Sequence, residues 1–546
     1  PAVGSEQSPT PEALRLIDEA RGLIERRQFE DAIERLNAAI ELSPRFPDAY
    51  LFRGNAFEGA EKLKEALADH KKAAELRPAY KQAWFEQSRI YDRLEQFDLA
   101  IRAATKAIEI DPEFWQAWLG RGRANYYLKL NEQALPDLDR AIEINPTFPD
   151  AYHYRALTHL RLYNFAEAVE DRRKAAEVAP DDYVQHYRLA FTLWNQYRPT
   201  EAIAPATRAI ELNPAAVGGW RVRGSVFLQL GRHEEALADF TEVVRIEPQN
   251  HHSWRQRGWL HFELGRREEA LSDLDRAVQL GPGYGPNYLW RGRVQLVLGQ
   301  AEAALNDLAR AEHLGRGRAG LSGAIDLHDL WQWRGEALLL QGDAKAAIAE
   351  FTRRLEHLAA LAAGTHSAYD TAPPETGEVD PAGAGPLMES EKQAPTTKNA
   401  WEDRAYLLRA VAYQTAGQPA NALADFERWF ARYPGTAYAH YHRGRSYVDL
   451  ERWDDALADF SRALELRHDW VDAREMRGAV QFQRGDFQAA LDDFVTSRKQ
   501  DPYSEYLARM IRLSGEKLGR SPAEIEELLK LPATPGEQTP KPPTSP

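Results

Sequence analysis

The sequence predicts an all-α protein in which helical hairpins are stacked one upon the next. The first observation is the segment from Val217 to Asn250, where apolar or small residues recur twice with the i, i+4, i+7 spacing of one helix face. These residues are Trp220, Gly224 and Phe227, then, after Gly231, Ala236, Phe240 and Val243. Pro248 closes the segment, because proline cannot continue a helix. The segment is therefore interpreted as two helices joined by a turn.

The second observation is a period of 34 residues that runs along most of the chain. Prolines occur at Pro44, Pro78, Pro112, Pro146, Pro180, Pro214, Pro248 and Pro282. Alanines keep the same step at Ala32, Ala66, Ala100, Ala134, Ala168, Ala202, Ala236, Ala270 and Ala304, and again at Ala422, Ala456 and Ala490. Each hairpin would bury its apolar face only against its neighbours, so a chain of 546 residues needs no single large core.

The period divides the first two thirds of the chain into a leader, repeats and one interruption. Residues 1–9 are polar and lack periodicity, which is typical of a flexible leader, and Thr10 before Pro11 indicates the cap of a first helix. Residues 10–318 hold nine repeats without a gap. Residues 319–327 are a short insertion, and a tenth repeat follows at 328–361.

The remaining third contains a linker, three repeats and a cap. Residues 362–402 are rich in Gly, Pro, Thr and Glu, which favours a disordered, low-complexity linker that could serve as a hinge. Repeats 11–13 occupy residues 403–504, which brings the predicted count to thirteen. Residues 505–531 are predicted to be C-terminal capping helices, because Ser521 to Glu524 form a capping-box sequence. Residues 532–546 are a Pro-rich tail that we expect to be disordered.

A 34-residue helical hairpin with Trp or Tyr, Gly, Ala and a final Pro at fixed positions resembles the tetratricopeptide repeat. The resemblance covers most of residues 13–504. It implies a right-handed α-solenoid that does no catalysis, whose first helices line a concave groove where a partner polypeptide binds. The family's clamp for a terminal carboxylate, built from Lys and Asn, is not matched in any three successive repeats.

The composition excludes or disfavours several kinds of ligand and binding site. The net charge of −14 favours solubility and argues weakly against nucleic acid as the main ligand. The absence of cysteine excludes disulfides and thiolate metal sites. No apolar run is long enough to span a membrane, and no signal peptide opens the chain. The chain begins with Pro1, so we expect a processed or trimmed chain or part of a longer protein, cytoplasmic or in another soluble compartment.

Arginine and an acidic residue recur together, sixteen positions apart. The pairs include Arg121 with Asp137, Arg223 with Asp239, Arg257 with Asp273 and Arg443 with Asp459. In the first repeat the charges are exchanged, as Glu19 and Arg35, and where the arginine is missing the acid is missing too, as in Gln87 and Ala103. Such covariation predicts structural ion pairs between the two helices of a hairpin rather than a phosphate-binding surface. If partly exposed, each would contribute about 0–1 kcal/mol.

A slot shared by Trp84, Trp118, Trp220, Trp254 and Trp331 lies on the predicted apolar stripe. Base stacking is one interpretation of such a row, but packing in the core is favoured.

Residues of the first helices that the repeat pattern leaves free are the candidates for partner binding. They are Arg89, Arg123, Tyr154, Arg188, Arg221, Arg255, Trp259, Trp290, Arg293, Trp333 and Arg445. Arg, Trp and Tyr dominate interface energetics, so this set suits a partner segment with carboxylates and aromatic or apolar side chains. The alternative is that these residues are solvated or pack between repeats.

No catalytic motif, cofactor site or metal site is predicted. The histidine clusters at 251–252 and 440–442 lack the i, i+4 spacing of a zinc site. We therefore expect a protein-interaction scaffold. Three alternatives remain open: a sensing or targeting module of a larger enzyme such as a kinase or glycosyltransferase, an RNA-binding repeat array, and a self-assembling structural subunit.

Overall fold

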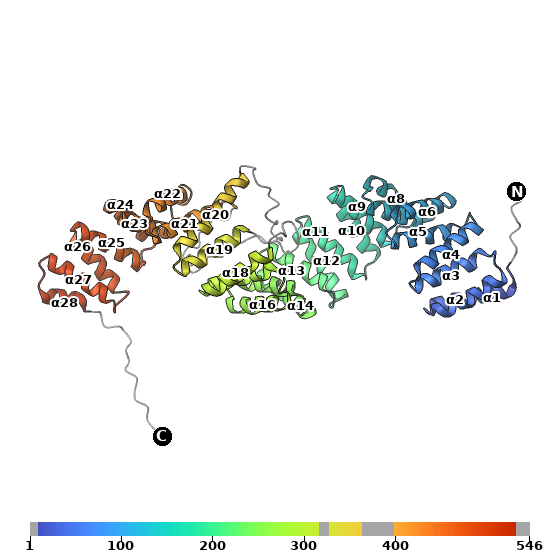
Figure 1. Ribbon diagram of the computed structural model, residues 1–546, viewed down its shortest axis with the longest axis horizontal. Coiled ribbons are helices and arrows are strands. Elements are labelled where there is room, and N and C mark those ends of the chain that lie inside the picture. The colour runs from blue at the N-terminus through green and yellow to red at the C-terminus, as the bar shows by residue number, and fades with distance from the viewer. Residues whose placement is uncertain (1–8, 316–326, 363–397, 531–546) are drawn as a thin grey trace, which may run out of the picture. The chain divides into compact units, whose positions relative to one another are not determined.

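The computed structural model describes residues 9–315, 327–362 and 398–530, and these contain twenty-eight α-helices and no strand (Figure 1). The chain divides into two compact units, Pro1–Ile246 and Glu247–Pro546. The helices of the first unit are α1 (Pro11–Glu25), α2 (Phe29–Leu42), α3 (Pro47–Gly59), α4 (Leu63–Leu76), α5 (Lys81–Arg93), α6 (Phe97–Ile110), α7 (Trp115–Tyr127), α8 (Asn131–Ile144), α9 (Pro149–Arg161), α10 (Phe165–Val178), α11 (Tyr183–Asn195), α12 (Pro199–Leu212), α13 (Val217–Gln229) and α14 (His233–Ile246). Those of the second are α15 (His251–Glu263), α16 (Arg267–Leu280), α17 (Gly285–Val297), α18 (Ala301–Gly315), α19 (Leu327–Leu340), α20 (Ala344–Ala362), α21 (Lys398–Thr415), α22 (Pro419–Phe430), α23 (Ala437–Asp449), α24 (Trp453–Leu466), α25 (Val471–Arg484), α26 (Phe487–Arg498), α27 (Glu505–Lys517) and α28 (Pro522–Leu529). The all-α repeat architecture predicted from the sequence is confirmed.

Within a hairpin, the turn between the two helices contains one residue in the left-handed backbone conformation. Glycine occupies this position in all but one of the later hairpins, as Gly231 does with φ of 71°, and the exception is Glu451 with φ of 55°. In the first six hairpins the position holds a residue with a side chain, such as Glu95 (φ 57°) or Tyr197 (φ 55°). The turn geometry is therefore kept even where the sequence does not supply the residue that adopts it most easily.

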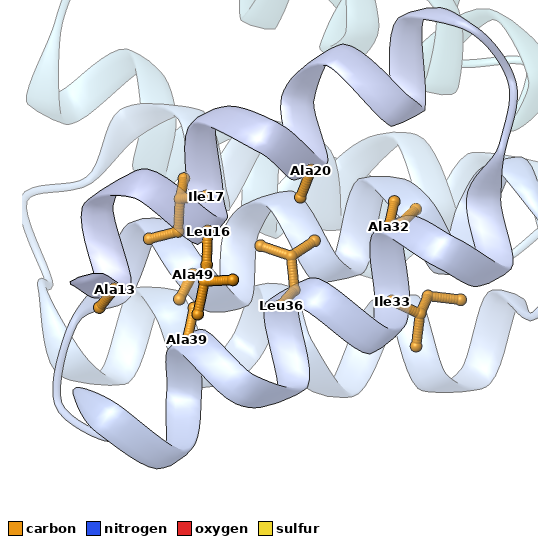
Figure 2. Packing of buried hydrophobic residues seen from close by; sticks show 10 residues of the cluster. Ala13, Leu16, Ile17, Ala20, Ala32, Ile33, Leu36, Ala39 and Ala49 are labelled. Carbon is orange, nitrogen blue, oxygen red and sulfur yellow. The ribbon is translucent and has the colours of Figure 1, made fainter.

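The core is a series of separate apolar clusters, each formed by helices that are close together in the chain. Figure 2 shows the first, where Leu16 and Ala20 of α1 lie beside Leu36 of α2 and Ala49 of α3. The alanines allow the helices to approach closely, and the glycine of the first helix serves the same purpose. A Cβ added to Gly335 would lie 2.5 Å from the ring of Phe351, so the close approach requires glycine here.

Odd-numbered helices form one face of each stack. Many of them contact the next odd-numbered helix, as α5 does with α7, α11 with α13 and α17 with α19. Within each unit, the even-numbered helices make their most extensive contacts with the odd-numbered helices before and after them. We call the surface formed by the odd-numbered helices the odd-helix face.

The region around the predicted linker differs from the expectation. Helix α21 begins at Lys398, inside the range assigned to the linker, because Pro395 is the last helix-breaking residue before it. Its Leu408 and Ala412 pack with Ala347 and Phe351 of α20. Arg409 Nη1 also donates to Thr352 Oγ1 at 3.2 Å. The helices before and after residues 363–397 therefore pack like consecutive repeats, which argues against a hinge at this place.

Other boundaries fall partly outside the described residues. The predicted leader lies almost wholly in residues 1–8 and the tail in residues 531–546, neither of which is described. Residues 319–326 of the predicted insertion and residues 316–318 of the predicted ninth repeat are also outside, and α19 begins at Leu327, the last residue assigned to the insertion.

The C-terminal helices close the second stack. In α28 the Ser521 side chain accepts from the Glu524 backbone and the Glu524 side chain accepts from the Ser521 backbone, so the predicted capping box is confirmed. Ile525 is buried, and its side chain lies against Gly515 of α27. None of the described helices combines the length and the apolarity that a membrane crossing requires.

Candidate partner-binding surface

The repeated arginines form two-pronged ion pairs with aspartates of the following helix. In the pair of Arg223 and Asp239, Nε donates to Oδ2 at 2.9 Å and Nη2 donates to Oδ1 at 2.8 Å. The same geometry occurs for Arg121 with Asp137, Arg257 with Asp273 and Arg443 with Asp459. The aspartates are buried, and burial raises the pKa of the Asp239 carboxyl while Arg223 opposes the rise. Loss of the arginine would strand a buried carboxylate, so the pair matters more than the 0–1 kcal/mol expected of an exposed one.

Many of these arginines also form a hydrogen bond with a residue of the preceding repeat. The comparison of the repeats within the sequence did not predict this contact. Arg121 Nη1 donates to Thr105 Oγ1 at 3.2 Å, and Arg155 Nη1 to Asp139 Oδ1 at 2.7 Å. Corresponding bonds join Arg53 to Asn37, Arg223 to Thr207, Arg291 to Asp275 and Arg477 to Ser461. One guanidinium thus ties three helices together. A polar residue sixteen positions before the arginine could have indicated this contact in the sequence. The type of that residue varies from repeat to repeat, so the pattern is hard to recognise.

Most of the tryptophans in the shared slot form a hydrogen bond with the backbone. The indole N–H of Trp84 donates to the carbonyl of Pro78 at 2.9 Å, and Trp220 bonds to Pro214 at 3.0 Å. The same bond is made by Trp118 and Trp254, and by Tyr50, Tyr152 and Tyr288 in other repeats. In these repeats the slot fixes the first helix against the turn before it, whereas the indole N–H of Trp331 is buried without a hydrogen-bond partner.

Two of the predicted binding arginines lie in a ladder between odd-numbered helices. Arg89 Nη2 is 3.0 Å from Glu58 Oε1, and Arg123 Nη2 is 2.9 Å from Asp92 Oδ2. In each case the acid precedes the arginine by 31 residues, so the pairing escapes a comparison made at a spacing of sixteen. These arginines have partners already, which corrects the expectation that they are free.

Two further candidates are buried rather than displayed. Arg293 is 2% exposed and Trp333 is 5% exposed. Arg293 Nη1 lies 3.3 Å from Glu336 Oε2 of α19, and its guanidinium carbon is 5.3 Å from the Trp333 ring centroid. The acid is 43 residues away, across the insertion, so no fixed spacing could have revealed it.

Five further candidates are half-buried, namely Arg221, Arg255, Trp259, Trp290 and Arg445. Trp259 and Trp290 meet edge to face at 6.4 Å, and Trp290 also meets Trp333 at 5.7 Å. Arg255 and Arg445 lie over the rings of Tyr284 and Tyr441, respectively. Arg221 lies on α13 and is half-buried.

The remaining two candidates, Tyr154 and Arg188, lie beside a pocket. The α9–α11 pocket has a volume of about 140 Å³ and is lined by Leu157, Leu160, Arg172, Tyr187, Arg188, Phe191, Thr192, Asn195 and Gln196. Phe191, one of the lining residues, is 42% exposed. Tyr154 packs nearby against Tyr126 and Tyr127 of α7, with ring centroids 6.1 and 6.3 Å away. Aromatic side chains therefore extend along the odd-helix face from α7 to α11.

The electrostatics of the pocket are those of two neighbouring cations. Arg172 is buried, and burial together with Arg188 lowers its pKa to about 10. Its Nη1 donates to Nδ1 of His153, and burial with the two arginines lowers the pKa of that imidazole to about 3, so it is neutral. Arg188 Nη1 is 3.9 Å from Asp150 Oδ1. The comparison of the repeats within the sequence did not identify Arg172 as a candidate, although it is the one arginine at a position that is apolar or histidine in the other repeats.

Metal chemistry finds no support in the part of the chain that the structure describes, because no group of three or more His, Cys, Asp and Glu side chains is placed to hold an ion. His251 and His252 stack with ring centroids 4.0 Å apart. His440 bonds to Asp459 and to the carbonyl of Pro434.

Comparison with protein-family models identifies the repeat. A model described as "Tetratricopeptide repeat" matches residues 85–149, 187–251, 221–285, 255–320, 407–467 and 443–505, which together make up more than half of the chain. Two further models, "TPR repeat" and "Tetratricopeptide repeat", match residues 23–59 and 138–170.

Individual proteins match over shorter stretches. DnaJ homolog subfamily C member 3 of Rattus norvegicus is 33% identical over 87 residues, which is 16% of this chain and 17% of that protein. Hsc70-interacting protein 1 of Drosophila melanogaster is 30% identical over 126 residues, which is 23% of this chain and 33% of that protein. The crystal structure of the APC/C hetero-tetramer Cut9-Hcn1 is 12% identical with a TM-score of 0.40, covering 92% of this chain and 96% of that chain. The chain thus spans a third or less of the length of either curated relative.

Proposed function

The chain belongs to the tetratricopeptide repeat family, and from this we propose that it is a protein-interaction adaptor that binds a partner segment on the odd-helix face. The observation that carries the proposal is the α9–α11 pocket, which is lined by the apolar residues Leu157, Leu160 and Phe191 and by the arginines Arg172 and Arg188. Exposed aromatic residues next to a pocket are the usual anchors of protein interfaces.

The surroundings of the pocket extend the apolar surface. Tyr127 of α7 is 45% exposed, and Tyr163 and Tyr197, on the turns after α9 and α11, are 79% and 83% exposed. Large exposed aromatic side chains gathered in neighbouring repeats favour contact with another molecule. A stack of preformed hairpins would bind such a segment with little ordering cost on its own side.

A protein partner is favoured over a nucleic acid. The printed name of the Drosophila relative describes it as a protein that interacts with Hsc70, which supports a protein partner for this chain as well. The net charge of −14 opposes a phosphate backbone, and the repeated arginines that suggested one are paired with aspartates.

Selection from a random peptide library displayed on phage tests this function. The full chain is expected to enrich a family of related peptides, and Phe191→Ala should weaken their binding about tenfold, because it removes an aromatic anchor. Tyr503→Ala is the matched control, since Tyr503 is an 89% exposed aromatic residue between α26 and α27. Failure to enrich any peptide, or equal binding by Phe191→Ala and the wild type, would contradict the proposal.

A further inference from the structure

Arg172 occupies a position that elsewhere in the repeats belongs to the core. The residues at this position in the other hairpins of the first unit are Leu36, His70, Ala104, Leu138, Ala206 and Phe240, all of them buried. Arg172 is buried as well, with 4% of its surface exposed, yet it carries a charge. A buried charge in place of a leucine costs stability unless an opposite charge meets it.

The described residues do not supply that opposite charge. No carboxylate among them lies within salt-bridge distance of Arg172, and its Nε has no hydrogen-bond partner. The neighbouring Asp171 is held by Arg155 at 2.6 Å. The side chain that Arg172 does contact, His153, is neutral and offers only a lone pair.

Arg188 adds a second positive charge to the pocket. Arg188 lines the same pocket with 28% of its side chain exposed, and its nearest acid, Asp150, is 3.9 Å away and half exposed. Two arginines thus line a small cavity, and Asp150, the acid that approaches Arg188, is not among the residues that line it. Charge complementarity calls for an anion in the pocket.

We propose that the α9–α11 pocket receives the carboxylate of an aspartate or glutamate side chain from the partner segment, held by Arg172 and Arg188, with an apolar neighbour of that residue on Leu157, Leu160 and Phe191. This rests on the proposed function and names the chemistry of the segment. A side chain fits better than a chain terminus, because a terminus would carry backbone amide groups into a pocket whose walls are mainly apolar.

The assignment predicts opposite effects on stability and on binding. Arg172→Leu restores the residue found at Leu138 and Leu36, so the melting temperature of the unbound full chain is expected to rise. Arg173→Leu is the control, because Arg173 lies on the same helix and is paired with Glu201 at the surface. A fall in melting temperature for Arg172→Leu would show that the charge is structural and would overturn the proposal.

Binding is measured with two libraries of short, amidated peptides that differ only in a fixed central residue, glutamate or glutamine, between randomised positions. The wild-type chain should bind the glutamate library at least about tenfold more tightly by fluorescence polarisation, since a buried charge-assisted pair is gained. The preference should disappear in Arg172→Leu and Arg188→Gln and persist in Arg173→Leu.

The outcomes separate the two proposals. Equal binding of both libraries by the wild type, with loss in Phe191→Ala, would leave the adaptor function standing and refute the carboxylate subsite. Tight binding of the glutamine library only when its C-terminus is a free acid would also refute it, because the terminus would then be the ligand. If neither library binds, both proposals fall.

Discussion

At the scale of single residues, the core positions of the hairpins tolerate polar residues at a measurable cost. His70 lies in α4 at the position that Leu138 occupies in α8, and it is 0% exposed. Neither of its ring nitrogens has a hydrogen-bond partner. Burial, and secondarily Arg89, lowers the pKa of this imidazole to about 3. The folded state therefore holds His70 neutral where the unfolded chain would protonate it.

The substitution His70→Leu should stabilise the protein, and more so in mild acid. At pH 8 we expect a gain of about 1–3 kcal/mol, because two unpaired polar atoms leave the core. The depressed pKa means that the unfolded state binds the extra proton, so wild-type stability falls as the pH drops from 6.5 towards 3. The gain should therefore grow by about 1.4 kcal/mol for each pH unit below 6.5. Thermal melts of both proteins at pH 8 and pH 5 measure this.

His233→Gln serves as the control, because His233 is exposed and should show the same melting temperature as the wild type at both values of pH. An equal difference between His70→Leu and the wild type at pH 8 and pH 5 would mean that His70 titrates normally when folded.

At the scale of helices, a buried charge network joins the repeats on either side of residues 363–397. Glu336 of α19 is 3.3 Å from Arg293 of α17 and 3.1 Å from Arg404 of α21. Gln332 donates to Glu336 at 2.8 Å and accepts from Arg354 of α20 at 2.9 Å. Although burial by itself would raise it, the pKa of Glu336 is lowered by Arg404 and Arg293. One carboxylate thus contacts helices from three successive repeats.

Glu336→Gln should destabilise this part of the second unit by about 3–5 kcal/mol, because it removes the buried carboxylate that Arg293 and Arg404 contact. Trp333 lies 5.3 Å from Arg293, so tryptophan fluorescence during denaturant unfolding reports the loss. Glu302→Gln on the exposed side of α18 is the matched control and should leave the midpoint unchanged. A Glu336→Gln midpoint equal to that of the wild type would show that solvent reaches the network.

At the scale of the whole molecule, the sequence predicts the contacts that recur from repeat to repeat, and it does not predict the contacts that occur only once. The 34-residue period indicates helices and turns correctly, and the covariation of Arg223 with Asp239 reflects a real contact, because the same geometry recurs many times. The contacts of Arg293 and Arg172 are single events. The contact of Arg293 crosses an insertion of irregular length, and Arg172 is an exception at a position that is apolar or histidine in the other repeats. Contacts of this kind depend on three-dimensional packing that no period encodes.

A stack in which helices contact mainly their neighbours should also respond locally to damage. Phe460 of α24 is 0% exposed and packs with Ala456 and with Val480 of α25, so Phe460→Ala should cost about 3–5 kcal/mol. Because the lost contacts lie between adjacent hairpins, amide hydrogen exchange should accelerate in α23 to α26 and stay unchanged in α1 to α12. Leu466→Ala, at a 39% exposed position of the same helix, should alter neither region. Faster exchange throughout the chain in Phe460→Ala would instead mean that the repeats unfold as one cooperative body, since only long-range coupling could carry the effect from α24 to the first unit.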